Sequence, residues 1–145
     1  MKIKIAIGLI LAAIAGMALT FPCVAPAQEV VVIVNNNVPA SSLTSDDIQN
    51  IFLAKKTQWD NGAKINFATL KDCPTHEAFL KKYLQKTSSQ FQRYFRTLVF
   101  TGKGSVPKSF DTEESLVGYV AATDGAIGYV SSGTNTSSVK VITVN

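Results

Sequence analysis

A run of five consecutive β-branched residues, VVVIV at residues 30–34, constrains the fold of this chain more than any other stretch. Such side chains lose rotamer freedom in helices and pack well in strands, so the run and the following Asn35 predict a strand. No polar residue alternates with the apolar ones, which indicates that both faces of the strand are buried. Strands buried on both faces are typical of α/β proteins, in which helices cover the two sides of a central sheet.

Helix and strand patterns alternate along the rest of the chain. Thr44 and Asp47 form a capping-box pattern at the start of the first predicted helix. The apolar spacing of residues 91–99 is the strongest helical period in the sequence. Further helices are predicted from Pro74, from Thr87 and across residues 111–122, and further strands at about residues 64–69, 126–130 and 139–144. This order predicts an α/β fold, a three-layer α/β/α sandwich with a mostly parallel or mixed central sheet.

The first 27 residues have the pattern of a secretory signal peptide. Two lysines precede an uncharged apolar run at residues 5–19, and the small residues of APA at 25–27 mark a cleavage site after Ala27. The apolar run is shorter than the ~20 residues that a membrane-spanning helix needs. We therefore predict a signal peptide at residues 1–27, a single domain at residues 28–145 and a periplasmic or secreted location.

Charge and cysteine content narrow the class of partner. Removal of the two signal-peptide lysines leaves 12 basic residues against 10 acidic ones, a net charge of +2. No run of three Lys or Arg occurs, so nucleic acid is not an expected partner. Cys73 stands alone in the predicted mature chain, which excludes an internal disulfide, and such a cysteine is usually buried and inert. Lipidation of Cys23 is an alternative to cleavage after Ala27, although Pro22 replaces the small residue usual at that place.

The segment LKDCPTHEAFL (residues 70–80) is the leading candidate for a binding site. It contains the predicted start of a helix, where unpaired N–H groups carry a partial positive charge. We expect Lys71, Thr75 and the amides of Thr75 and His76 to converge on one oxyanion, with Cys73 in the same turn. Asp72 opposes an anion and is instead a candidate helix cap. A capped helix start without a ligand is therefore the alternative.

The same segment does not predict a metal site or an active site. One cysteine and one histidine do not complete the three or four ligands that zinc needs. A catalytic Cys–His or Ser–His pair lacks an orienting acid, and the helix dipole disfavours a protonated His76. We expect a neutral, partly exposed His76, no metal or cofactor, and no enzymatic activity.

Two other polar segments supply candidate ligand-binding residues. Asn36, Ser41 and Ser42 follow the first strand, where α/β proteins bind ligands at the carboxyl ends of their strands. Lys103 lies in the glycine-rich sequence TGKGS, which lacks the spacing of a phosphate-binding P-loop. An ordinary Asn-rich turn and a helix C-cap followed by a loop are the alternatives. Trp59 and the aromatic side chains of residues 91–95 are expected in the core.

Four stretches together resemble the phosphate-binding proteins of ABC transporters. They are LTSDDIQNIFLAKKTQWDNG (43–62), HEAFLKKYL (76–84), VFTGKG (99–104) and ATDGAIGYV (122–130), in that order. The resemblance covers about residues 30–144 and implies one lobe of a type II periplasmic binding protein. Full members of that family close two lobes on a tetrahedral oxyanion.

The resemblance also implies a position for the anion. In the family, a turn rich in Ser, Gly and Thr at a helix N-terminus, preceded by an arginine, grips the phosphate. The matching place here is residues 70–79, where Lys71 is the available cation and residues 72–75 read Asp-Cys-Pro-Thr. The resemblance thus implies an exported protein that binds inorganic phosphate or a similar oxyanion and works with an ABC permease. The alternative is an interaction or assembly module that keeps the fold without the ligand, and a homodimer would rebuild a two-sided cleft.

Overall fold

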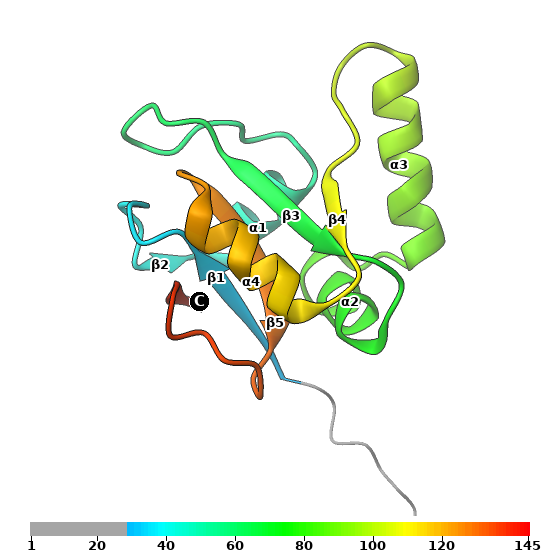
Figure 1. Ribbon diagram of the computed structural model, residues 1–145. Helices are drawn as coiled ribbons and strands as arrows, with labels where there is room; N and C mark the ends of the chain where they lie inside the picture. The colour runs from blue at the N-terminus through cyan, green and yellow to red at the C-terminus, as the bar shows by residue number, and fades with distance from the viewer. Residues whose placement is uncertain (1–28) are drawn as a thin grey trace, which may run out of the picture.

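The protein is described by a computed structural model covering residues 29–145 (Figure 1). The predicted signal peptide and Cys23 lie outside the described residues. Along the chain the elements are β1 (Val30–Val34), β2 (Ser42–Leu43), α1 (Ser45–Phe52), β3 (Asn66–Leu70), α2 (Pro74–Phe79), the π-helical turn η1 (Leu80–Leu84), α3 (Ser88–Phe100), β4 (Lys108–Phe110), α4 (Glu113–Ala122), β5 (Ala126–Ser131) and β6 (Lys140–Val144).

One six-stranded sheet, in the order β2-β6-β1-β5-β3-β4, forms the centre of the fold. β1 pairs antiparallel with both of its neighbours, β5 and β6. The remaining pairs, β2 with β6, β3 with β5 and β3 with β4, are parallel. The sheet is therefore mixed, as predicted, and β1 runs against the other five strands. The ends of β3, β4 and β5 consequently meet at one end of the sheet, which we call the carboxyl end, whereas β1 ends at the opposite one.

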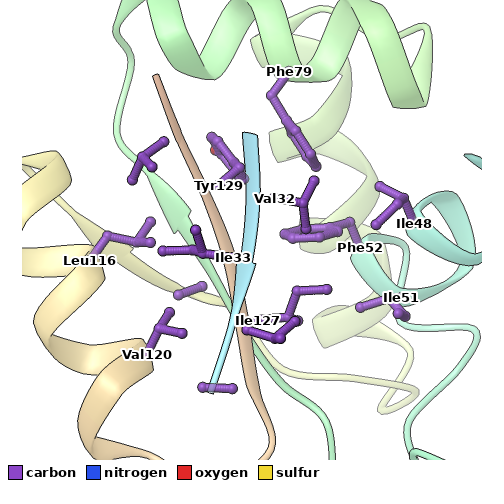
Figure 2. Close-up of a cluster of buried hydrophobic side chains, with 14 of the residues drawn as sticks. Val32, Ile33, Ile48, Ile51, Phe52, Phe79, Leu116, Val120, Ile127 and Tyr129 are labelled. Carbon is purple, nitrogen blue, oxygen red and sulfur yellow. The ribbon is translucent and has the colours of Figure 1, made fainter. Parts of the chain in front are cut away.

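The β-branched run lies where both faces of the sheet are covered. Figure 2 shows β1 and β5 edge-on, with Ile33 directed toward Leu116 of α4 and Val32 directed toward Phe52 of α1. Val32 and Ile33 are almost fully buried. Helix α4 thus covers one face, and α1 and α2 cover the other, which gives the predicted three layers. Helix α3 stands to the side, next to the edge strand β4 (Figure 1).

Local sequence signals account for where the helices begin. The capping box of Thr44 and Asp47 is present at α1, and an equivalent box of Thr87 and Gln90 starts α3. Helix α2 runs directly into η1, which ends at Gln85 in the left-handed conformation. The predicted start at Pro74 is confirmed, and the π-helical turn was not predicted.

Aromatic side chains fill the core beneath α1 and α2. The rings of Phe79 and Tyr129 stack with centroids 3.8 Å apart, and Phe52 packs edge-on against both (Figure 2). Trp59 is also buried, as predicted, and its indole N–H donates to the Gly125 carbonyl at 3.0 Å. Because a buried indole needs an acceptor, this bond fixes the loop before β3 against the start of β5.

Two strands and one cap were missed by the sequence analysis. β2 and β4 have two and three residues, too few to produce a periodic pattern. Asn35 follows β1 rather than belonging to it. Its buried side-chain amide donates to the carbonyls of Val120 and Ala121, at 2.9 and 3.1 Å, and so closes the last turn of α4.

Candidate functional site

The carboxyl end of the sheet is where two helices begin. Register places Leu70 of β3 opposite Phe110 of β4. β5 pairs parallel with β3 at Asn66 and Phe67 and then runs on to Ser131. Helix α2 follows β3 after three residues, and α4 follows β4 after two. In α/β sheets, ligands bind outside the carboxyl ends of the strands, so this is the part of the fold in which to look for a site.

Cys73, rather than Asp72, caps α2. The Cys73 sulfur accepts a hydrogen bond from the backbone N–H of His76 at 3.4 Å. The Asp72 carboxylate instead accepts from the hydroxyl of Ser88, the first residue of α3. The suggestion that Asp72 caps this helix is therefore wrong, because its side chain turns away to connect α2 with α3. Cys73 is a half-buried free thiol with a structural contact.

His76 is buried rather than partly exposed, which corrects the sequence expectation. It is 3% exposed, and its Nδ1 shares a hydrogen bond with the Tyr129 hydroxyl. That hydroxyl also accepts from the Leu70 backbone N–H at 3.0 Å, so one oxygen atom connects β3 with α2.

Burial decides the charge state of this pair. Removal from water lowers the pKa of His76, although the nearby charges of Asp72 and Glu77 raise it in part. Burial likewise raises the pKa of Tyr129 far above its usual value, against a smaller opposite effect of the Leu70 hydrogen bond. Both side chains are therefore neutral near pH 7, as the sequence analysis expected for His76. The Leu70–Tyr129–His76 chain fixes the start of α2 against β3 and β5.

Polar groups at the carboxyl end converge on the Glu113 carboxylate. The Ser131 N–H donates to Glu113 Oε1 at 3.0 Å, and the Ser131 hydroxyl donates to Oε2 at 2.8 Å. The hydroxyls of Thr134 and Thr75 also hydrogen-bond this carboxylate. We call these donors, from Thr75, Ser131 and Thr134, the anion cradle.

The cradle favours a negative charge. Partial burial alone would raise the pKa of Glu113, but the hydrogen bonds from Thr134, Thr75 and Ser131 outweigh it and lower that pKa below its usual value. The carboxylate is thus ionised at neutral pH. Hydroxyl and amide donors gathered on one anion are the groups that also recognise phosphate and sulfate.

Lys71 lies at the same end of the sheet but is engaged in an ion pair. Its ammonium group is 3.0 Å from the Asp111 carboxylate, and both side chains are mostly exposed. An exposed pair of this kind contributes little to stability and exchanges readily with solvent ions.

A groove of about 670 Å³ separates α3 from β3 and β4. Its lining is mainly apolar and includes Phe91, Phe95 and Val99 of α3, together with the polar side chains of Lys71, Asp72 and His76. Phe91 and Phe95 are buried, as predicted, whereas Val99 is 44% exposed and so is not a core residue.

The other predicted ligand residues lie away from the cradle. Asn36 follows β1 and is therefore at the opposite end of the sheet, about 16 Å along β5 from Ser131. Its side chain donates to the Ser138 carbonyl at 3.2 Å. Ser41 and Ser42 lie at β2, four strand positions from β3, or roughly 19 Å. Lys103 follows the far end of α3, about 18 Å along the helix from Ser88.

The structure thus brings together Lys71, Cys73, Thr75 and His76 from the predicted set. It adds Glu113, Ser131 and Thr134, which the sequence analysis did not select. The signal for the last two was the Ser/Thr-rich sequence SSGTNTSS (residues 131–138), directly after the strand predicted at residues 126–130. Glu113 lies in the first turn of the helix predicted across residues 111–122, where an acid suits the helix dipole without any ligand.

The family model described as the PBP superfamily domain matches residues 27–143, most of the chain. The chain belongs to the PBP superfamily.

Solved structures show the same fold. A protein described as a phosphate ABC transporter substrate-binding protein, from Clostridium perfringens and with bound phosphate, has 22% identity and a TM-score of 0.64. An ABC-type phosphate transport receptor from Vibrio cholerae has 19% identity and a TM-score of 0.56. The PBP-superfamily chain is 81% covered in both comparisons but spans only 45% and 46% of these proteins. No curated protein matches the sequence.

Residues 29–145 contain neither a candidate membrane span nor a candidate metal site. No helix in that range is long and apolar enough to span a membrane. No group of three or more His, Cys, Asp or Glu side chains in it is arranged to hold a metal ion.

Proposed function

We propose that this protein is an exported binding protein for phosphate or a similar oxyanion, which it passes to an ABC permease. The observation that carries the proposal is the anion cradle. Its donors lie at the carboxyl ends of parallel strands, in a chain of the PBP superfamily, and they already hold a carboxylate. The apolar N-terminal segment of the sequence supports export.

Thr75 and Lys71 connect the cradle with the site predicted from sequence. Thr75 is the second residue of α2 and contributes a buried hydroxyl to the cradle. Lys71 is the cation of the same segment, and its exposed pair with Asp111 leaves its charge available to an incoming anion. Cys73 and His76 support the site by shaping the turn, since both are engaged in contacts within it.

The proposal requires a second surface. The resemblance to phosphate-binding proteins implies closure of two lobes on the anion, and the chain spans less than half of the two solved proteins that share its fold. A second copy of the chain would supply the missing side in a two-fold arrangement. We therefore expect weak anion binding by the monomer and stronger binding where the protein dimerises.

A thermal-denaturation series with phosphate, sulfate and chloride tests this function. Ligand at 100 times its Kd adds about 2.7 kcal/mol of stability, so millimolar phosphate should raise Tm measurably above the chloride control at equal ionic strength. Thr134→Val should reduce the phosphate effect because it deletes one cradle donor. Thr136→Val is the matched control, since the Thr136 side chain makes no hydrogen bond among the described residues. Equal Tm values in all three salts would refute the proposal.

The groove beside α3 favours a second candidate, an assembly module without a small ligand. Phe100 and Val106 both line the groove and are 93% and 66% exposed. Large exposed apolar side chains beside a groove often mark protein interaction surfaces. Sedimentation velocity at rising protein concentration, with Phe100→Ser for comparison, distinguishes the assembly module from the anion-binding protein. Association of the chain that anions do not affect supports the assembly module alone.

A further inference from the structure

Glu113 makes contacts that the start of α4 does not require. The helix already has a cap, because the Thr112 hydroxyl accepts the Ser115 N–H at 3.1 Å. Glu114, the next residue, supplies an exposed acid that suits the positive end of the helix dipole. Glu113 instead turns toward the end of β5.

The groups that surround the Glu113 carboxylate come from three separate segments. Thr75 belongs to α2, Ser131 ends β5, and Thr134 lies in the loop that follows. Both carboxylate oxygens are used, because Oε1 accepts the Ser131 N–H and Oε2 accepts the hydroxyls of Ser131 and Thr134. All of these donors are neutral, so a single negatively charged group satisfies them. A free carboxylate or phosphate would present the same kind of oxygen atoms to the same donors.

We propose that Glu113 is an internal ligand, whose carboxylate occupies the anion cradle and competes with external oxyanions for the same donors. The inference rests on the proposed function, because the proposed function assigns the cradle as the anion site. It adds that the protein sets its own anion affinity through a tethered competitor. A purely structural role for Glu113, tying α4 to β5 and α2, would not make anion binding depend on it.

The competition has a calculable size. An external anion binds only the fraction of molecules in which Glu113 has left the cradle, and its apparent affinity falls by that fraction. If Glu113 occupies the cradle nine-tenths of the time, its removal tightens anion binding about ten-fold. Its negative charge also repels the anion, so the gain from removing it is larger at low ionic strength.

The test compares Glu113→Ala with Glu114→Ala. Both remove one acid from the first turn of α4, but only the first empties the cradle. Acetate is the probe, because its methyl and carboxylate groups replace the atoms that Glu113→Ala deletes, and phosphate is titrated in parallel by calorimetry. We expect acetate to raise the Tm of Glu113→Ala but not of the wild type or Glu114→Ala, with sodium chloride as the salt control. We also expect Glu113→Ala to bind phosphate at least about ten-fold more tightly than the wild type.

Glu113→Gln covers the case in which the alanine variant does not fold. The amide keeps the shape of the side chain but cannot accept from all the cradle donors, so external anions should displace it more easily than the carboxylate. Folded variants that bind acetate and phosphate no better than Glu114→Ala would overturn the inference. A wild type that ignores phosphate beside a Glu113→Ala variant that binds it would refute the proposed function and support the inference. Phosphate binding that is equal in the wild type and both Glu113 variants would support the proposed function and overturn the inference.

Discussion

Replacing Tyr129 with phenylalanine isolates one oxygen atom at the base of the candidate site. The hydroxyl accepts from the Leu70 N–H at 3.0 Å and hydrogen-bonds His76 Nδ1. Leu70, His76 and Tyr129 are each at most 3% exposed, so water does not replace a lost partner. The stacking of this ring on Phe79 is kept in the variant, because phenylalanine has the same ring.

The expected loss follows from the two groups left behind. A buried donor or acceptor without a partner costs about 1–3 kcal/mol, so the two groups together should lower the free energy of unfolding of Tyr129→Phe by about 2–6 kcal/mol. That is a large part of the 5–15 kcal/mol typical of a small domain. The loss should loosen the start of α2, since the hydroxyl joins that helix to β3.

Urea unfolding followed by the fluorescence of Trp59 measures this loss. Tyr119→Phe is the matched control, because the Tyr119 hydroxyl makes no hydrogen bond within residues 29–145, and it should change stability by less than about 0.5 kcal/mol. A Tyr129→Phe variant within 1 kcal/mol of the wild type, with an unchanged urea dependence, would show that the buried hydroxyl is not the connection described here.

Two further predictions test the surroundings of the site. Gly125→Ala would place a Cβ atom 2.2 Å from the Lys64 carbonyl oxygen at a φ of +72°, so we expect a loss of roughly 2–5 kcal/mol in thermal denaturation, against little change for Gly133→Ala, whose position is open. Burial lowers the pKa of His76 below 6.5, so the unfolded chain binds its proton more readily and stability should fall as pH drops below about 6.5. Urea midpoints that do not change between pH 7.5 and 5.5 would contradict a buried neutral His76.

Local signals in the sequence were sufficient for most elements. The β-branched run predicted the central strand because its burial on both faces follows from its own residues, without knowledge of which strands pair with it. Thr44 and Thr87 predicted two helix starts because a capping box involves only residues that are close in sequence. The direction of β1 could not be read in the same way, because strand direction depends on which distant strands it pairs with. Asn36 was consequently assigned to the binding end of the sheet although it lies at the other.

The anion cradle was only partly predictable for the same reason. Thr75 was recognised from its place at the start of a helix, which is a local feature. Its association with Ser131 and Thr134 depends on the parallel pairing of β3 with β5, which joins segments more than fifty residues apart. Glu113 enters the cradle only because β4 lies beside β3, and β4 itself is too short to be recognised from its residues.

The pairing of β1 also has a consequence for how the chain folds. The first strand to be synthesised forms its ladders with β5 and β6, which lie about a hundred residues later. Because these contacts are so far apart in sequence, the entropy cost of closing a long loop comes before the hydrogen bonds of β1 can form. Chains with such a high contact order fold slowly. The nascent polypeptide therefore has no complete sheet until β6 has been synthesised, and β1 stays without its sheet partners for most of synthesis.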